Sequence, residues 1–250
     1  MWSASFEGNA GQAVNTSEWN IITNVNFNNE VQEYTTSTDN LRLSGEGTLQ
    51  IIPRRSPSGE WTSGRIESKF SYTPSDKEVT VFQAELRFGD SPRSQQQGIW
   101  PAFWTLGESH RHGVPWPECG ELDIMERKNG EPETFGVPHC GPGDVPCGLM
   151  VKTVPMPPAD GDFHVWKIEI DRRPADWQSE SITWIRDDVE YNKVTGADID
   201  DEEIWKAIAQ SPMYFILNVA VGGNFPGPPN DETADGESNM LEVRKVEVFG

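Results

Sequence analysis

The clearest sign of secondary structure in the sequence is V-T-V-F-Q-A-E-L-R-F, residues 79–88. Apolar side chains recur at every second position from Phe82 to Phe88, and Gln83, Glu85 and Arg87 occupy the positions between them. An alternation of period two is typical of a β-strand with one face on a core and the other on a wetter surface. Residues 79–88 therefore predict a half-buried strand.

Further runs extend this pattern over the chain. Four of them alternate, at residues 66–72, 166–170, 182–185 and 241–249. Residues 213–221 are apolar at nearly every position, which indicates a strand buried on both faces. Turn-forming residues punctuate these runs at 44–47, 57–59, 129–130 and 228–230.

Helical periodicity is convincing in one place only. Asp200 or Asp201 can cap a short helix whose Ile204, Trp205 and Ile208 share a face. Many strands with one short helix predict an all-β fold, a sandwich or jelly roll built from two stacked antiparallel sheets. At 250 residues the chain suits one large β domain spanning 1–250.

The net charge of the chain limits the classes of molecule that it can bind. The formal net charge is −20, which argues against nucleic acid because that binding needs clustered Lys and Arg. It also weighs against sulfated or carboxylated polysaccharides, which such a field repels. No apolar run reaches eighteen residues, so no membrane span is predicted. We expect a neutral partner and a monomer.

Three cysteines are present, and two of them bracket a Gly/Pro-rich loop. A disulfide between Cys140 and Cys147 suits that short loop in an oxidising compartment, although the sequence leaves open a pairing of Cys119 with either one. Without a partner, Cys119 is expected to be an inert buried thiol. A sequon at residues 15–17 is compatible with secretion, so we expect a secreted, extracellular protein.

The chemistry centres on G-E-L-D-I-M-E, residues 120–126. In an extended strand Glu121 and Asp123 share one face, while Leu122 and Ile124 point to the core. Strict alternation turns Glu126 inward. A one-residue bulge near residues 124–125 returns it to the face of the other two acids.

The distance between the carboxyl groups of Glu121 and Glu126 indicates which reaction they can catalyse. With the bulge, the backbones of Glu121 and Glu126 lie about 13 Å apart, and leaning side chains can bring the carboxyl groups to about 5–5.5 Å. Retaining glycosidases use that separation, whereas inverting enzymes need about 6.5–9.5 Å. Three carboxyl groups this close share a proton, so one Glu can attack while the other donates, and Asp123 can orient Glu121.

Three acids on one strand face also fit a solvated surface balanced by Arg127 and Lys128. The neighbourhood favours a carbohydrate site instead, because tryptophans flank the acids and indole faces stack on sugar rings. These tryptophans are Trp100, Trp104 and Trp116. Trp100 is the one that core packing explains best.

Together the motifs resemble glycoside hydrolase family 16, in its laminarinase-like branch. The matching segments are GIWPAFW (98–104), WPECGELDIME (116–126), VPH (137–139), FHVW (163–166), ILNVAVGGNFPG (216–227) and WTSGRIES (61–68). The resemblance covers residues 19–249 and implies a β-jelly-roll whose concave face forms an open substrate cleft. The form with Met125 as extra residue is similar to enzymes acting on β-1,3 linkages.

The resemblance also implies roles for individual residues. It assigns Glu121 as nucleophile, Asp123 as assisting acid and Glu126 as acid/base. Trp104 and Trp116 match sugar-platform positions, and His139 matches a histidine beside the cleavage point. Weaker candidates for hydrogen bonds or stacking along the cleft are Asn29, Arg65, Trp205 and Asn218.

The expected function is retaining, endo-acting hydrolysis of β-1,3-glucan, with mixed-linkage β-1,3-1,4-glucan as a second substrate. The alternatives are a glucan transglycosylase of the same fold and a glucan-binding protein with weak catalysis. Retention of both Glu121 and Glu126 disfavours the binding protein.

No metal or other cofactor is expected. Many relatives carry a calcium-binding Asp in the last strand, where this chain has Arg244. A guanidinium stays cationic in proteins and repels Ca²⁺. His110 and His112 lack the further ligands of a metal cage and are expected on a surface loop.

Overall fold

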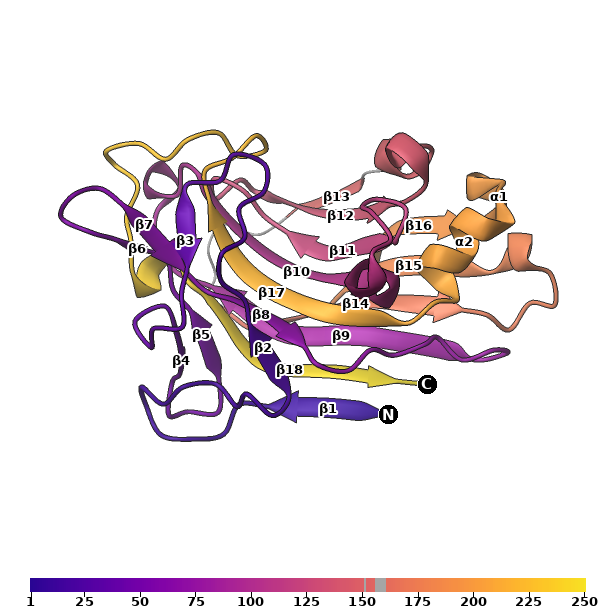
Figure 1. The fold of residues 1–250 in the computed structure, drawn as a ribbon, viewed down its shortest axis with the longest axis horizontal. Coiled ribbons are helices and arrows are strands. Elements are labelled where there is room, and N and C mark those ends of the chain that lie inside the picture. The colour runs from indigo at the N-terminus through magenta and orange to yellow at the C-terminus, as the bar shows by residue number, and fades with distance from the viewer. Residues whose placement is uncertain (151, 156–160) are drawn as a thin grey trace.

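The computed structural model describes residues 1–150, 152–155 and 161–250. Two large antiparallel sheets stack on each other, and the strands cross the molecule side by side (Figure 1). This is the all-β architecture that the alternating runs predict. No helix among the described residues is long and apolar enough to cross a membrane.

The first sheet has the order β16-β15-β14-β9-β18-β5-β4, and β1 pairs with β18. Its strands are β1 (Trp2–Ser5), β4 (Leu41–Leu43), β5 (Leu49–Ile51), β9 (Val79–Phe88), β14 (His164–Asp171), β15 (Ser181–Arg186), β16 (Val189–Thr195) and β18 (Leu241–Phe249). The predicted strands at 79–88, 166–170, 182–185 and 241–249 all lie here.

The second sheet has the order β13-β12-β11-β10-β17-β8-β2. Its strands are β2 (Trp19–Ile21), β8 (Arg65–Ser68), β10 (Ile99–Gly107), β11 (Glu121–Glu126), β12 (Glu133–His139), β13 (Lys152–Pro155) and β17 (Met213–Val221). A small third sheet joins β3 (Gln32–Tyr34), β7 (Trp61–Ser63) and β6 (Arg54–Arg55), with β3 and β7 parallel.

The main core lies between the two large sheets. The rings of Phe82 on β9 and Phe215 on β17 approach to 5.5 Å between centroids, and Phe103 on β10 stacks on Phe215 at 5.8 Å. All three side chains are fully buried. Every residue of β17 is buried, as its continuous apolar run predicts, because the strand is central in its sheet and covered on both faces.

The predicted strand at 66–72 is shorter in the structure, since β8 ends at Ser68. The Ser68 hydroxyl accepts the backbone N–H of Phe215 and donates to the carbonyl of Phe70. A side chain thus replaces the next rung of the ladder, and pairing resumes only at an isolated bridge between Tyr72 and Met213.

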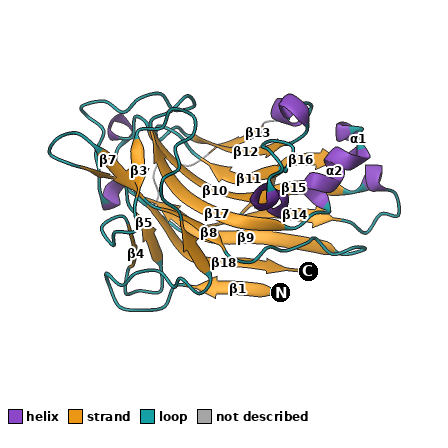
Figure 2. Cartoon of the chain, in the orientation of Figure 1, coloured by secondary structure: helices purple, strands orange, loops and turns teal. Residues whose placement is uncertain are grey.

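Helices are few and lie mainly at one end of the sheets (Figure 2). The predicted helix is α2 (Glu202–Ala209), and Asp201 caps it by accepting the N–H groups of Glu203 and Ile204. The short α1 (Gly196–Ile199) precedes it and was not predicted. Six short 3₁₀ helices complete the described chain: η1 (Arg93–Gln95), η2 (Glu108–His112), η3 (Pro142–Asp144), η4 (Cys147–Leu149), η5 (Trp177–Ser179) and η6 (Glu237–Asn239).

The disulfide between Cys140 and Cys147 is present, which confirms that pairing. Cys119 is free and buried, as expected for an inert thiol. Burial and the nearby charge of Glu121 raise the pKa of the Cys119 thiol to about 11, so it stays protonated and weakly nucleophilic at neutral pH.

Candidate active site

The predicted bulge is present in β11. Asp123 pairs with Val137 of β12 and Glu126 pairs with Phe135, so three steps on β11 correspond to two on its neighbour. The ladder with β10 shifts at the same place. Leu122, Ile124 and Met125 all lie in the main core, which leaves the acids on the other face.

The three acids line one cavity of about 220 Å³ on the outer face of the second sheet. The alternation of β10 and β17 supplies most of its floor, because every second side chain of these strands points away from the core. The lining residues are Phe27, Asn28, Glu30, Arg65, Trp100, Ala102, Trp104, Leu106, His110, Trp116, Glu121, Asp123, Glu126, Asn218 and Ala220.

Two tryptophans of β10 are fixed by hydrogen bonds at the floor of the cavity. The indole N–H of Trp100 donates to Oε1 of Glu126 over 2.8 Å. The indole N–H of Trp104 donates to Oδ1 of Asn218 over 2.8 Å, and the Asn218 amide donates to the hydroxyl of Tyr34 over 3.2 Å. Trp100 therefore contacts a carboxyl group of the site as well as packing against Phe225.

A row of residues crosses the sheet to Glu126. Arg65 on β8 pairs with Asn218 on β17, Asn218 with Ala102 on β10, and Ala102 with Glu126 on β11. With strands about 4.8 Å apart, the row spans about 14 Å of backbone. The Arg65 guanidinium lies 4.9 Å from the centroid of the Trp104 ring. Arg65 and Asn218 thus belong to the cavity that contains the acids, and their contacts with a substrate stay a prediction.

His139 and Trp116 lie beside the acids. Glu121 and His139 are partners in the ladder between β11 and β12. The His139 ring places Nε2 3.3 Å from Oδ2 of Asp123, and its centroid is 5.6 Å from that of Trp116. Trp116 is 51% exposed, so its ring is accessible to a ligand.

Burial dominates the electrostatics of the acids. Burial and the charge of Asp123 raise the pKa of Glu121 well above its ordinary value, against the lowering effect of His139. Burial likewise raises the pKa of Asp123. Burial and Asp123 raise the pKa of Glu126 to about 8, although the Trp100 hydrogen bond lowers it. Glu126 therefore retains its proton at neutral pH and can act as an acid.

Side chains of the first sheet support the bulge from behind. The indole N–H of Trp184 on β15 donates to the carbonyl of Asp123 over 2.8 Å. The Tyr191 hydroxyl on β16 donates to the carbonyl of Ile124. A bulge interrupts the ladder and leaves carbonyls without partners, so these two donors satisfy groups that are expensive to bury unpaired. Sequence reasoning missed both, since the donors lie about sixty residues away.

The loop before β3 supplies lining residues that were also missed. Phe27, Asn28 and Glu30 face the cavity, whereas the predicted Asn29 instead donates from its side chain to Asn224 over 2.9 Å. Asn28 and Asn29 both adopt positive φ, which Asn tolerates better than most residues. Adjacent asparagines were the available signal for this turn.

The paired glycines after β17 admit this loop. Gly222 and Gly223 have φ of 72° and 105°, and a Cβ on Gly223 would lie 3.1 Å from the carbonyl oxygen of Asn28. The glycines thus allow a close approach by the chain's own backbone.

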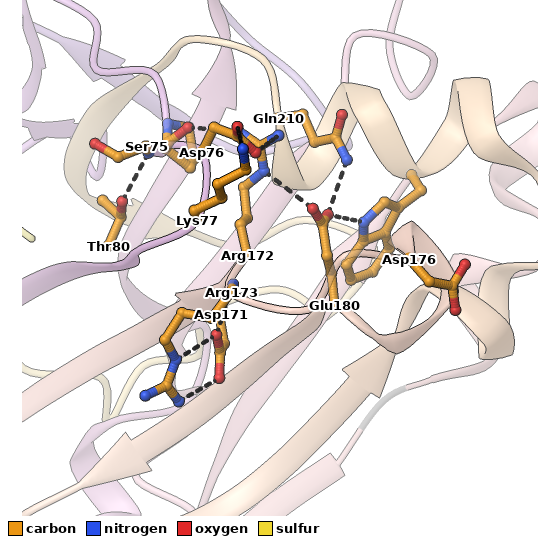
Figure 3. A network of polar contacts seen from close by, with 12 residues as sticks. Ser75, Asp76, Lys77, Thr80, Asp171, Arg172, Arg173, Asp176, Glu180 and Gln210 are labelled. Carbon is orange, nitrogen blue, oxygen red and sulfur yellow. Dashed lines mark hydrogen bonds and ion pairs between the residues drawn. The ribbon is translucent and has the colours of Figure 1, made fainter.

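The prediction for Trp205 is wrong, because its side chain is fully buried in the core. The indole N–H donates to Oε2 of Glu180 over 2.7 Å. Figure 3 shows Glu180 at the centre of a network with Arg172 and Gln210. The apolar face of α2 packs inward, so Trp205 cannot stack on a substrate in the cavity.

The expected absence of a metal in the cavity stays a prediction. Glu121, Asp123 and His139 bring one ligand atom each within 4.8 Å of one another. Although burial opposes its charge, contacts with Asp123 and Glu121 raise the pKa of His139 to about 10. The His139 ring is therefore cationic at neutral pH beside these carboxyl groups.

Two further residues that the sequence singled out, Arg244 and His110, have well-defined surroundings in the structure. Arg244 forms an ion pair with Glu85 and lies 3.8 Å from the centroid of the Phe163 ring. The absence of calcium there stays a prediction. His110 lies on η2 and lines the cavity, whereas it was expected on a surface loop.

Comparisons with known proteins identify the family of the chain. Residues 16–151 match the family described as XgeA-like, catalytic GH16 domain. The solved endo-1,3-β-glucanase of Streptomyces sioyaensis superimposes with a TM-score of 0.92 and 33% identity, over 99% of this chain and 94% of that one. The β-glucanase of Rhodothermus marinus is 33% identical over 80% of this chain.

The chain is shorter than some of these relatives. It spans 67% of the length of the Rhodothermus marinus protein. The glucan endo-1,3-β-glucosidase A1 of Niallia circulans is 27% identical over the whole of this chain, which spans 37% of that protein. The matched family region contains the acidic strand with its bulge and most of the cavity floor. The chain belongs to glycoside hydrolase family 16 and is a glycoside hydrolase.

Proposed function

We propose that the chain hydrolyses internal β-1,3 bonds of a neutral glucan with retention of configuration. The observation that carries the proposal is the β11 bulge, which sets Glu121, Asp123 and Glu126 on one cavity wall. The names of the Streptomyces and Niallia relatives support the β-1,3 linkage. Mixed-linkage β-1,3-1,4-glucan is a second substrate.

The reaction proceeds in two displacements. The Glu121 carboxylate attacks the anomeric carbon while the Glu126 carboxylic acid protonates the departing glycosidic oxygen, so the C–O bond breaks as the glycosyl ester forms. Glu126 then removes a proton from water, which attacks the same carbon and releases Glu121. Asp123 and Glu121 are close enough to influence each other's ionisation. The His139 cation lowers the pKa of both acids and so favours the ionised form of Glu121.

The remaining cavity residues bind the glucan. Trp104 and the exposed Trp116 offer ring faces to sugars. Asn218 and Arg65 supply polar groups along the row that leads to Glu126. The formal charge of −20 suits a neutral polysaccharide.

We further propose that residues 1–250 form one catalytic domain that acts outside the cell. The disulfide between Cys140 and Cys147 supports an oxidising compartment.

The test compares the parent with Glu121→Gln and Glu126→Gln on laminarin, lichenan, agarose and cellulose. The parent is expected to release oligosaccharides from laminarin, and Glu121→Gln to lose at least about a thousandfold in rate, as expected when a nucleophile is removed. NMR of the first product should show the β anomer. Parent-like activity of Glu121→Gln, or an α product, contradicts the mechanism, and products longer than the substrate indicate glycosyl transfer.

A further inference from the structure

The His139 ring lies between two carboxylates on different elements. Its Nε2 faces Oδ2 of Asp123 at 3.3 Å, and its Nδ1 lies 2.6 Å from Oδ2 of Asp144. Asp123 belongs to β11 and lines the cavity, whereas Asp144 ends the 3₁₀ helix η3 and does not line it. The second carboxylate contacts the site through the histidine, and its charge also raises the pKa of Asp123.

Asp144 is held from both sides. Its Oδ1 accepts the backbone N–H of Cys140 over 3.1 Å, so both carboxylate oxygens have donors. Its backbone has φ of 61°, in the left-handed region, and Gly141 and Gly143 have φ of 70° and 67°. A non-glycine residue persists in this conformation when its surroundings impose it. The disulfide between Cys140 and Cys147 closes the loop that contains all three residues.

We propose that Asp144 is a positioning residue that fixes the orientation and charge of His139, and that the Cys140–Cys147 disulfide holds Asp144 in reach of the ring. The proposal rests on the function proposed above, because it gives His139 its task beside the nucleophile. Asp144 acts through the histidine and touches no substrate.

The charges around the ring explain the consequence. Three acidic groups face it, namely Glu121 and Asp123 from β11 and Asp144 from η3. Burial alone lowers the pKa of His139, but these three groups raise it to about 10, so the ring is cationic at neutral pH. The cation in turn lowers the pKa of Glu121 and of Asp123. Loss of the Asp144 charge is therefore expected to lower the pKa of His139 and to weaken the effect of the His139 cation on the two acids.

The direct test follows the titration of His139 by NMR in the parent, Asp144→Asn and Asp144→Ala. The chain has four histidines, so a His139→Gln variant assigns the signal. Removal of one neighbouring anion is expected to move the midpoint of the His139 titration down by about one to three pH units. An unchanged midpoint in both variants overturns the proposal, and this readout does not depend on catalysis.

The kinetic test separates charge from position. Asparagine keeps an acceptor for the ring N–H, whereas alanine removes both acceptor and charge. We expect kcat on laminarin to fall about tenfold in Asp144→Ala and less in Asp144→Asn, with KM little changed. The alkaline limb of the kcat profile, which reports the Glu126 acid, should move to higher pH in both, because a His139 that loses its proton at lower pH no longer lowers the pKa of Glu126. A loss of thermal stability with a parent-like pH profile overturns the positioning role.

A second His–Asp pair provides the matched control. Asp187 has φ of 45°, its Oδ2 lies 2.5 Å from Nδ1 of His164, and its Oδ1 accepts the N–H of Val165. This pair lines a different surface pocket, away from the acids. Asp187→Asn is expected to leave both kcat and the His139 midpoint unchanged. A parallel fall in the two Asp variants indicates a general effect on folding and contradicts the proposal.

The role of the disulfide is tested with a Cys140→Ser/Cys147→Ser double variant. We expect its His139 midpoint to move in the direction of Asp144→Ala. A parent-like midpoint in the folded double variant overturns the disulfide part alone. If the parent has no activity on laminarin or lichenan, the proposed function fails, while the NMR midpoints still decide the role of Asp144.

Discussion

The indole N–H of Trp100 and Oε1 of Glu126 form a 2.8 Å hydrogen bond between adjacent strands. A donor of this kind stabilises the ionised carboxylate, so it lowers the pKa of Glu126 against the larger effect of burial, which raises it. The pair thus moderates the pKa of the proposed acid, which is about 8.

Trp100→Phe tests this moderating effect. The variant keeps an aromatic ring but removes the donor, so the pKa of Glu126 is expected to rise. The acid then stays protonated to higher pH, and the alkaline limb of the kcat/KM profile should move upward. Phe225→Leu is the control, because Phe225 packs on Trp100 at 5.3 Å between centroids without donating to Glu126. A limb that moves downward in Trp100→Phe contradicts the assignment.

Glu126→Gln is expected to change the dependence of stability on pH. The pKa of Glu126 rises from 4.5 to about 8 on burial. A raised pKa in the folded state contributes stability fully below pH 4.5 and loses it as pH rises through 8. Glutamine does not ionise, so the Tm of the variant should gain on the parent between pH 4.5 and 8, by at least about 2 °C. The measurement is Tm at both pH values, and a constant difference refutes the raised pKa.

Trp184→Phe is expected to weaken the bulge. It removes the donor to the Asp123 carbonyl and leaves a buried acceptor unpaired, at about 1–3 kcal/mol. Trp166→Phe is a matched control, since Trp166 is equally buried and its indole N–H has no acceptor among the described residues. We expect Trp184→Phe to lose more unfolding free energy and more kcat than Trp166→Phe. Equal losses in urea titrations and assays exclude a specific role for this bond.

Trp116→Ala and Trp205→Ala should behave oppositely. Trp116 is half exposed, so its removal is expected to raise KM for laminarin about 2- to 10-fold and leave Tm unchanged. Trp205 is fully buried, so its removal is expected to lose about 3–5 kcal/mol of unfolding free energy. Steady-state kinetics and thermal unfolding of both variants check this. A parent-like KM in Trp116→Ala removes the proposed platform.

Local chemistry explains what the sequence could predict. Alternation defined β9 and β14, because a strand with one buried face must repeat every second residue. The bulge was predicted because strict alternation would place Glu126 on the face opposite Glu121, and the strand registers confirm the bulge. The short Gly/Pro-rich loop between Cys140 and Cys147 indicated the disulfide for a similarly local reason.

Contacts between distant segments account for what was missed. Nothing local ties Trp184 or Tyr191 to the carbonyls of β11, because the need for donors arises only once the two sheets stack. Phe27 and Glu30 enter the cavity through a turn whose direction depends on Gly223. For Trp205 the helical periodicity was the better guide, since a face shared with Ile208 predicts packing against the core.

The placement of β18 sets the order in which this molecule can be assembled. Residues 241–249 pair with β9, β5 and β1, and Figure 1 shows β18 running beside β1. On the ribosome, β9 therefore waits for more than half of the chain before one of its two neighbours is synthesised. Such distant pairings slow folding and leave strand edges open in the meantime, so the edges of β9 and β1 stay exposed to wrong pairing until β18 is available.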